Sequence, residues 1–596
     1  MPFYRDTIAL RGRQWRHAWR FGASLLVLAM VSLALALHFD PAVRLGSGLV
    51  WRNALPLLLC AWLVYALCGR LFLSMLVSTA LIALLYKVNG IKLRNLNMPL
   101  APDDAMLGHQ VAGNIGFFAH YTGYHAISLV LVPIILIACG VLVWRWEKHR
   151  FRPNWIARAG LLLVSLVALY TLLQGYQPWR QLYATHAMAS YGPWNPSNNA
   201  RTKGFIATFV RMCQDRQRSV PPPNKALVTS FVSHHEDAIR QREGRPTPQD
   251  LPDIVVVQSE AFFDPGVLKH VDFGQYTSHF EQVAASGITG SLTTPTYGGG
   301  TIRTEFETIT GYPMMAFPAV EYPYFGLANR HMPTVPRRLQ AFGYTTTLFH
   351  PYEADFWNRS ATMPALGFQR SYYEDAFKGA PRAGLFVSDH SLYEAVLNHL
   401  NTAATGPSYI MAITMENHGP WNRDAGDLTK LLKTNPLPAG LSPAGTYEMT
   451  YYVSHLLNGD QALAEFAQTL MARKRWTLLL FYGDHLPELS AAYGDLGFDN
   501  NQEAPSQHTR YMLLSNRPFD PDQRRQLDLA AYDLPGLVFD IAKLPEDGYL
   551  ALASTIRATA ARDAVPNADA YRDVQFNAAR LEVRCGHKLD DAGRCL

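Results

Sequence analysis

Two short stretches of the sequence carry side chains that could bind a divalent metal ion. Glu260 follows the apolar run 254–258, and Asp484 with His485 follows the apolar run 476–481. Carboxylates combined with an imidazole suit an ion of intermediate hardness, such as manganese or zinc. Either motif alone would more often be a helix cap or a turn residue, but the two together, at the ends of similar runs, predict a metal site.

A glycine-rich loop between these motifs could hold a nucleophile. Thr301 follows three consecutive glycines in the string 296–307, Thr-Tyr-Gly-Gly-Gly-Thr-Ile-Arg-Thr-Glu-Phe-Glu. The glycines allow close approach to a ligand, and the helix expected after them attracts phosphate. Thr304 and Glu307 are predicted to form a capping box. Thr301 could be a simple turn residue, but a bound metal and the helix dipole would together favour its alkoxide.

Two further groups of polar residues could bind a phosphate-linked substrate. They lie in 350–359 and 416–420, and the candidates are His350, Trp357, Arg359 and His418. An arginine can clamp phosphate oxygens, a tryptophan can wall a small polyol or amine, and a histidine can donate to phosphate or carry a proton. His350 could equally be a core histidine and Trp357 a packing residue, and Asp355 is expected to be structural.

The elements that must position these residues are strands of an α/β layered domain. Apolar runs alternate with helix-like stretches from Asp253 onward. The strand-like runs are 254–258, 345–349, 409–414 and 476–481. Reactive groups in such folds gather just past the carboxyl ends of strands. Each of the four runs is followed directly by polar residues named above, so these are expected to converge.

The first third of the chain is apolar enough for a membrane domain. Five runs approach the roughly 20 residues that cross hydrocarbon, and they are 21–39, 50–68, 71–86, 126–144 and 159–174. Basic residues crowd the N-terminus and the loop after the fourth run, which the positive-inside rule assigns to the cytoplasm. Five crossings then place everything after about residue 176 outside the cytoplasm.

The remaining organisation follows from composition. We expect a transmembrane domain at 1–176, a juxtamembrane linker at 177–250, a catalytic domain at 251–546 and a C-terminal extension at 547–596. Within the linker, 205–212 could lie on the bilayer or be an ordinary connecting helix. A net charge of only +5, with no basic stripe, argues against nucleic-acid binding. Cys585 and Cys595 suit a disulfide in an oxidising compartment, with two free thiols as the alternative.

In order and spacing, these residues resemble the lipoteichoic acid synthase family of the alkaline phosphatase and sulfatase superfamily. The string 298–307 looks like that family's nucleophile loop. The resemblance implies a sulfatase-like α/β domain whose metal ligands are Glu260, Thr301, Asp484 and His485, with Thr301 also the nucleophile. It places His350, Trp357, Arg359 and His418 in a glycerol-phosphate pocket. Tyr352 stands where the family has an acidic or polar residue, and its hydroxyl could replace that side chain.

The function expected from this resemblance is phosphoglycerol transfer. Thr301 would attack phosphatidylglycerol, and a glycan hydroxyl would release the glycerol phosphate, while Arg359 and His418 hold phosphate oxygens. One divalent ion is expected, manganese first, with zinc or magnesium as alternatives. The tail cysteines fit a periplasm, which favours a Gram-negative member in the inner membrane, with its catalytic domain on the periplasmic side.

Three alternatives stay open. Phosphatidylethanolamine could be the donor, which would make the chain a phosphoethanolamine transferase. Water could replace the acceptor, as in a phosphodiesterase or sulfatase, although the Cys/Ser-x-Pro-x-Arg sequence that a sulfatase nucleophile needs is missing around Thr301. The domain could also be a binding module without catalysis.

Overall fold

The computed structural model describes residues 2–41, 43–95, 99–107, 126–147, 153–184, 188, 196–216, 221–318, 320–402, 406–419, 421, 433–562 and 568–585.

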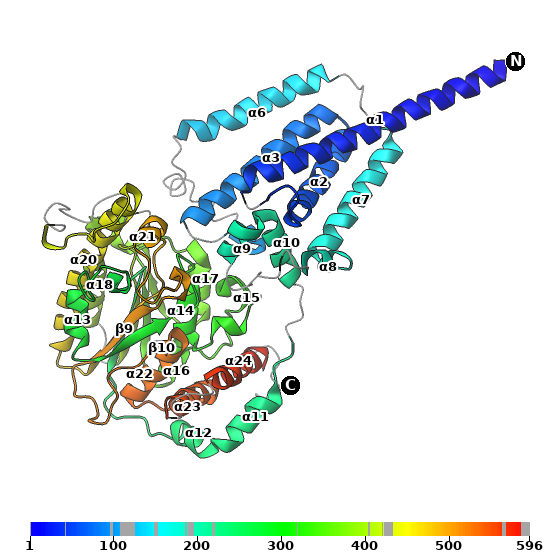
Figure 1. Cartoon of the computed structure of the whole chain (residues 1–596). Helices are drawn as coiled ribbons and strands as arrows, with labels where there is room; N and C mark the ends of the chain where they lie inside the picture. The colour runs from blue at the N-terminus through cyan, green and yellow to red at the C-terminus, as the bar shows by residue number, and fades with distance from the viewer. Residues whose placement is uncertain are drawn as a thin grey trace. The chain divides into compact units, whose positions relative to one another are not determined.

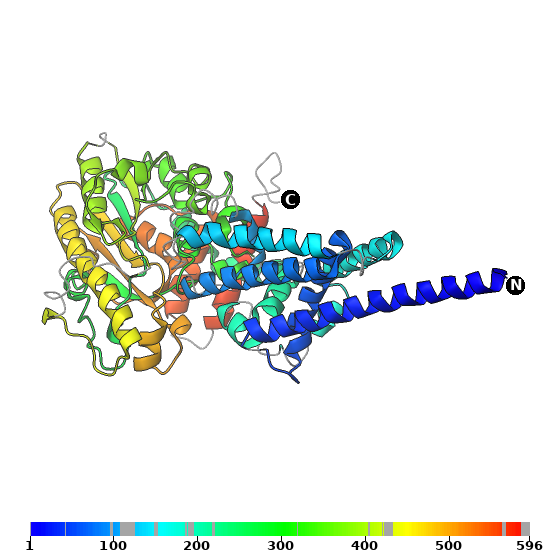
Figure 2. The same ribbon diagram turned by 90° about the horizontal axis from the view of Figure 1, so that it is seen from above.

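The N-terminal unit is a bundle of apolar helices. The chain divides into two units, Met1–Val220 and Pro221–Leu596. The long helices of the first unit are α1 (Pro2–Phe39), α2 (Leu49–Cys68), α3 (Leu71–Asn95), α6 (Ala126–Trp146) and α7 (Trp155–Leu173). Figures 1 and 2 both show α1, α3 and α6 running alongside one another.

Four of the five predicted membrane runs meet the length and composition of a membrane span in the described residues. These spans are Trp19–Phe39, Leu49–Cys68, Leu71–Leu93 and Trp155–Leu173. The remaining run lies in α6, where the described apolar part is the shorter Ile134–Trp146. The described residues therefore establish four candidate spans and leave the count of five as a prediction.

The turn between α2 and α3 consists of only two residues, Gly69 and Arg70. Gly69 ends α2 in the left-handed conformation, with φ of 66°. The Arg70 guanidinium donates to the Glu147 carbonyl at 3.0 Å, and Glu147 accepts in turn from the Leu73 amide at 3.1 Å. Arg158 donates through Nε to the Ala66 carbonyl at 2.9 Å. The basic residues beside the turn thus join it to the end of α6 and the start of α7.

Residues 205–212, for which the sequence allowed either a bilayer-surface or a connecting helix, belong to α10 (Phe205–Arg216). This is a connecting helix that packs on the bundle. Its Ala207 amide donates to Asn53 Oδ1 at 2.9 Å, and Gln214 Nε2 donates to the Leu172 carbonyl at 2.9 Å. These bonds join α10 to α2 and α7, because Asn53 and Leu172 belong to those helices. One face of α10 is therefore buried in protein.

The second unit is built on an eight-stranded sheet with the order β10-β2-β9-β8-β1-β7-β3-β4. The strands are β1 (Asp253–Ser259), β2 (Ile288–Thr293), β3 (Thr345–Phe349), β4 (Arg370–Tyr372), β7 (Ser408–Ile413), β8 (Thr477–Gly483), β9 (Thr509–Ser515) and β10 (Leu529–Ala530). β9 runs antiparallel to β2 and β8, while β8, β1, β7 and β3 are mutually parallel neighbours. Those four strands are the four apolar runs of the sequence, so the α/β prediction is confirmed.

Helices cover both faces of this sheet, which is why the middle residues of its central strands are apolar, as in 254–257 and 478–481. One face carries α13 (Ser278–Ala284), α18 (Asp389–Thr402) and α20 (Pro443–Met471), and the other carries α14 (Ile302–Thr310), α16 (Val335–Ala341) and α22 (Leu534–Ala542), as Figure 1 shows. All seven residues of β1 and of β8 are buried. The carboxyl ends of these rigid strands position the candidate site.

The chain before and after the sheet packs together within the second unit. α11 (Lys225–His234) and α12 (Glu236–Glu243) lie against α24 (Ala568–Cys585) and α23 (Gly548–Arg562). Arg242 of α12 forms ion pairs with Asp540 at 2.7 Å and Glu546 at 3.0 Å. Residues 221–250 thus belong to the same unit as the sheet. The predicted Cys585–Cys595 disulfide falls outside the described side chains.

Candidate active site

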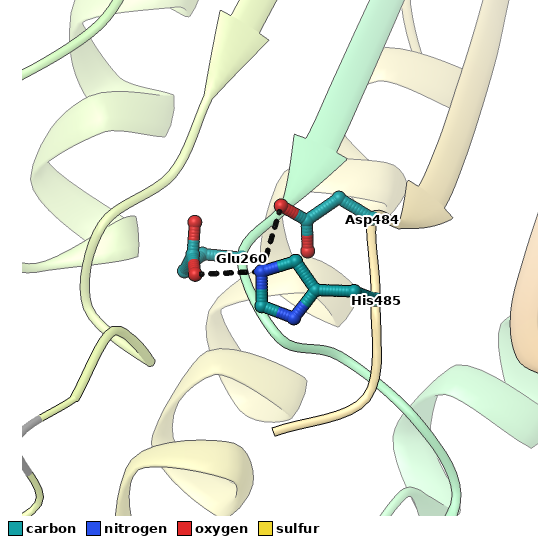
Figure 3. A group of neighbouring side chains, drawn as sticks. All are labelled: Glu260, Asp484 and His485. Atoms are coloured by element: carbon teal, nitrogen blue, oxygen red, sulfur yellow. Dashed lines mark ion pairs between the residues drawn. The ribbon is translucent and has the colours of Figure 1, made fainter. Parts of the chain in front are cut away.

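Two neighbouring strands deliver the predicted metal ligands to one point. β1 and β8 pair in parallel with Ser259 opposite Gly483, so the next residue of each strand end, Glu260 and Asp484, lies beside the other. The Ala261 amide donates to Asp484 Oδ1 at 2.8 Å. His485 Nε2 lies 3.3 Å from Glu260 Oε1 and 3.5 Å from Asp484 Oδ2 (Figure 3). Each side chain offers one ligand atom, all within 4.8 Å of one another.

The chemistry of these three side chains fits a divalent ion. The His485 ring donates through Nδ1 to the Leu486 carbonyl at 2.9 Å, so Nε2 is the ring nitrogen that faces the carboxylates and whose lone pair could bind a metal. Asp484 Oδ2 and His485 Nε2 are buried and make no hydrogen bond within the described residues. Buried polar atoms without hydrogen bonds cost free energy. A cation bound between them would offset that cost, and would supply charge stabilisation for phosphoryl transfer.

The protonation equilibria show how strongly the three groups interact. Burial raises the pKa of the Asp484 carboxyl, and the negative charge of Glu260 raises it further. Burial acts on Glu260 in the same direction, but nearby His418 and His485 outweigh it and lower the pKa of Glu260. Burial lowers the pKa of His485, yet Asp484 and Glu260 raise it to about 9. The site concentrates negative charge that only a cation or a proton can balance.

Thr301 lies against Glu260, one of the three candidate metal ligands. Its Oγ1 donates to Glu260 Oε2 at 3.2 Å, and the residue is 7% exposed. Gly298, Gly299 and Gly300 have φ values of 68°, 147° and 77°, which other residues adopt only with strain. The Gly298 amide donates to the Leu486 carbonyl at 2.9 Å, which ties the loop to the segment carrying His485. All four predicted metal ligands are therefore neighbours.

The predicted capping box is wrong. Thr301, not Thr304, precedes the first residue of α14, and it makes no side-chain cap. Thr304 lies inside the helix, where its hydroxyl donates to the Asp484 carbonyl at 2.7 Å, and Glu307 accepts from the Met314 amide at 2.7 Å. The three positive-φ glycines end the loop at Gly300, so the helix starts one turn earlier than the Ser/Thr-x-x-Glu spacing suggests.

Arg359 and His350 are brought together, and each also bonds to another protein group. The Arg359 guanidinium binds Glu305 through Nε and Nη2, with an Nη2–Oε2 distance of 2.8 Å. Its Nη1 donates to His350 Nε2 at 3.2 Å, while His350 Nδ1 pairs with the Ile413 carbonyl at 3.3 Å. Burial and then the Arg359 charge lower the pKa of His350, so its ring is neutral.

Trp357 and Tyr352, which lie close to Arg359 and His350 in the sequence, both pack against aromatic rings. Trp357 is buried with φ of 58°, a strained value for a residue with a side chain, and its ring lies 5.0 Å from Tyr322. The Tyr352 ring lies 5.3 Å from Phe356. Burial and then Glu353 raise the pKa of the Tyr352 hydroxyl, which stays neutral. Asp355 is exposed and accepts from Ser360, in keeping with a structural residue.

His418 lies close enough to Glu260 and His350 to shift the pKa of each. Its ring is 5.3 Å from Phe386. The start of α14 connects the metal-ligand residues to Arg359. Thr301 bonds to Glu260, and Glu305, one helical turn later, bonds to Arg359. His418, His350 and Arg359 are thus linked to the region of the metal ligands, while the ring contacts of Trp357 are with Tyr322 and Phe356. Their roles toward a substrate stay predictions.

Two buried groups are not among the residues predicted from the sequence. The first is Glu305, whose spacing of four residues from Thr301 places both on one helix face. The second group consists of Thr414, Glu416 and Asp389, near Glu260. The Glu260 amide donates to Thr414 Oγ1 at 3.1 Å, and the Asp389 amide donates to Glu416 Oε2 at 2.8 Å. No pattern in the sequence marks Asp389, which lies at the start of α18.

The family follows from comparison with known proteins. Residues 252–543 match the model of the sulfatase family. These residues form a sulfatase-family domain. The resemblance to the alkaline phosphatase and sulfatase superfamily is thereby confirmed, and the matched residues contain Glu260, Thr301, Asp484 and His485.

Three curated relatives align with the chain. A putative cyclic beta-1,2-glucan modification protein of Rhizobium meliloti (strain 1021) is 26% identical over 68% of this chain and 61% of its own. Capsular polysaccharide biosynthesis protein RkpI of the same organism is 32% identical over 41% of this chain and 43% of its own. Lipoteichoic acid synthase 2 of Bacillus subtilis (strain 168) is 26% identical over 26% of this chain and 23% of its own. Each alignment therefore spans less than two thirds of the relative.

A solved structure shares the fold of the sulfatase-family domain. It is the Streptococcus pyogenes phosphoglycerol transferase GacH in complex with sn-glycerol-1-phosphate, with a TM-score of 0.50 and 20% identity. The match covers 61% of this chain and 94% of that one.

Proposed function

We propose that the chain is a membrane-anchored, metal-dependent phosphoglycerol transferase. The donor is phosphatidylglycerol, and the acceptor is a hydroxyl of a periplasmic or surface glycan. The observation that carries the proposal is the contact of the Thr301 hydroxyl with Glu260, beside two buried ligand atoms of Asp484 and His485 that have no hydrogen bond within the described part of the chain. A metal ion held by Glu260, Asp484 and His485 would lie beside this hydroxyl and would favour its alkoxide.

The reaction proceeds in two displacements at phosphorus. Thr301 Oγ forms a bond to the phosphorus while the bond to the diacylglycerol oxygen breaks, and diacylglycerol leaves with a proton. The acceptor hydroxyl then attacks the same phosphorus, the bond to Thr301 breaks, and the Thr301 hydroxyl is restored. Arg359 and His418 hold the phosphate oxygens during both steps. The amide groups at the start of α14 add to this binding because they point out of the helix end.

The relatives support a transferase that acts on glycans. Two of them are named for glucan modification and for capsular polysaccharide biosynthesis, and a third for lipoteichoic acid synthesis. Apolar helices in the first unit suit a donor that is itself a membrane lipid. A soluble hydrolase would have no need of that anchor.

The donor is tested by supplying labelled phosphatidylglycerol and phosphatidylethanolamine in the same micelles to the purified full chain. We expect diacylglycerol release mainly from phosphatidylglycerol, and a glycerol-phosphate adduct on Thr301 by peptide mass spectrometry. The Thr301→Ala variant is the control and should give neither. A phosphoethanolamine adduct would make the chain a phosphoethanolamine transferase, and release without any adduct would point to direct hydrolysis.

We place the protein in the inner membrane, with the sulfatase-family domain on the periplasmic side. This orientation requires α6 to cross the membrane, because four crossings would return the domain to the side of the N-terminus. The contact of Arg70 with the Glu147 carbonyl puts the end of α6 beside the α2–α3 turn, as an antiparallel crossing requires. Lys378→Cys, at a side chain that is 80% exposed, should react with an impermeant maleimide on intact spheroplasts, with the unsubstituted chain as the background. Labelling only after lysis would reverse the orientation.

A further inference from the structure

Glu305 is a buried carboxylate that lies one helical turn after the nucleophile. Its amide donates to the Thr301 carbonyl at 3.0 Å, and its side chain has no exposed surface. Both carboxylate oxygens are used: Oε2 accepts from Arg359 Nη2 at 2.8 Å, and Oε1 accepts from the Tyr324 hydroxyl at 2.7 Å. α14 therefore connects Thr301 and Arg359 through a single turn of rigid helix.

The contacts of Arg359 define which of its N–H groups remain for a ligand. A guanidinium has five N–H donors in a fixed plane. Nε and Nη2 donate to Glu305, and Nη1 donates to His350 Nε2 at 3.2 Å. Among the described residues these contacts leave two N–H groups without a protein acceptor, one on each terminal nitrogen. A pair of this kind can bind two oxygens of a phosphate in parallel.

The orientation of Arg359 depends on Glu305 for an electrostatic reason. A cation that is 2% exposed needs a paired anion, because removing one partner of a buried ion pair leaves an uncompensated charge. His350 cannot supply that anion, since its ring is neutral and its Nε2 only accepts a hydrogen bond from Arg359. Tyr324 cannot supply it either, because burial and then Glu305 raise the pKa of its hydroxyl well above the usual value.

We propose that Glu305 is a positioning residue that sets the direction of the Arg359 guanidinium relative to Thr301. Tyr324 fixes the second carboxylate oxygen, and His350 fixes Nη1. The two remaining N–H groups of Arg359 then meet the phosphate that Thr301 attacks. This inference rests on the proposed function, in which Arg359 binds the transferred phosphate. A displacement of about 1 Å in such a group is enough to lower a rate about 100-fold.

The test compares Glu305→Gln and Tyr324→Phe in the full chain with bound metal. Glu305→Gln keeps the shape but removes the anion, and kcat should fall about 100-fold with a smaller change in KM. Tyr324→Phe keeps the ion pair and loses one hydrogen bond, so kcat should fall about threefold to tenfold with the melting temperature nearly unchanged. Tyr344→Phe is the matched control, because that buried hydroxyl has no hydrogen-bond partner in the described residues. It should leave kcat unchanged.

A double-mutant cycle separates positioning from a general structural effect. If Glu305 acts through Arg359, then Glu305→Gln adds almost nothing to Arg359→Lys, since the group to be positioned is already lost. Independent effects would multiply, and that outcome would overturn the proposal. Wild-type kcat in the Glu305→Gln variant would overturn it as well.

Binding of inorganic phosphate, measured by calorimetry on the same proteins, does not depend on the identity of the donor lipid. We expect the Kd of phosphate to rise about tenfold in Glu305→Gln and about threefold in Tyr324→Phe. If these losses occur while no glycerol-phosphate adduct forms, the proposed function fails and the positioning role stands. An unchanged Kd in Glu305→Gln, or no phosphate binding by the wild-type protein, would overturn the role of Glu305.

Discussion

The Thr301 hydroxyl donates to Glu260 Oε2 at 3.2 Å although the two residues are 41 positions apart in the chain. Glu260 follows a central strand and Thr301 precedes a helix on one face of the sheet, so two rigid elements hold the contact. An ionised carboxylate only accepts hydrogen bonds. The hydroxyl proton is therefore directed at Glu260, and the lone pairs of Thr301 Oγ are left for other partners.

Thr301→Ala should abolish transfer without unfolding the protein. We expect turnover to fall at least about 1,000-fold, because no other group can form the covalent intermediate. The lost hydrogen bond should cost only about 1 kcal/mol of stability. Intact-mass analysis after incubation with donor lipid should show an adduct on the wild-type chain and none on the variant. Thr301→Ser keeps a hydroxyl and should retain the adduct, and full turnover by the alanine variant would remove Thr301 from its role.

Removal of the metal should lower both activity and thermal stability. A ligand that binds only the native state stabilises it, by a free energy that grows with the logarithm of the free ligand concentration. We expect a chelator to abolish turnover and to lower the melting temperature, and manganese or zinc to restore both. Asp484→Asn loses one anionic ligand, so its melting temperature should hardly respond to the chelator. An equal response in wild type and variant would place the metal elsewhere.

The meeting of Glu260 and Asp484 at one edge of the sheet could be predicted because both residues follow the hydrophobic pattern directly. The runs that became β1 and β8 are buried throughout, and parallel neighbours end at the same edge of a sheet. Glu260 and Asp484 come immediately after those ends. Their meeting therefore required no knowledge of the loops.

Contacts that depend on loop conformation could not be predicted in this way. Arg359 reaches Glu305 across 54 residues, through a segment in which Trp357 and Asn358 both adopt left-handed backbone angles. A residue with a side chain rarely takes such angles, so nothing in the local sequence indicates the path. The start of α14 was misplaced for a similar reason. Its position depends on the glycine torsions that precede Thr301, while the capping-box spacing depends only on residue types.

Gly300→Ala should impair the nucleophile loop. Gly300 has φ of 77°, and a Cβ atom there would lie 2.8 Å from Thr296 Oγ1. We expect a stability loss of about 1 kcal/mol or more from the backbone strain, together with a fall in kcat, because Thr301 is displaced. Gly343→Ala is the matched control, since its φ is 84° but no atom lies within 4 Å of the added Cβ. It should lose similar stability and keep its kcat, and equal kcat in both variants would show that the loop tolerates the displacement.

The buried carboxyls of Asp389 and Glu416 should make the free energy of unfolding fall as pH rises. Burial and then the neighbouring Glu416 raise the pKa of Asp389 well above its ordinary value, and burial raises the pKa of Glu416 to about 7. A carboxyl with a raised pKa in the folded state holds a proton that the unfolded chain releases above about pH 4. Its favourable contribution is complete below that pH and is lost progressively as the pH rises through the folded pKa.

Asp389→Asn removes one of these carboxyls and the repulsion it exerts on Glu416. Relative to wild type, the variant should therefore gain stability between about pH 5 and about pH 8, by at least about 1 kcal/mol. The measurement is the melting temperature of the metal-saturated full chain in detergent across that range. Asp375→Asn is the control, because its carboxylate is 92% exposed, and it should follow the wild-type curve. Parallel curves for Asp389→Asn and wild type would mean that Asp389 is ionised in the folded protein, with a cation or a hydrogen-bond donor beside it that balances its charge.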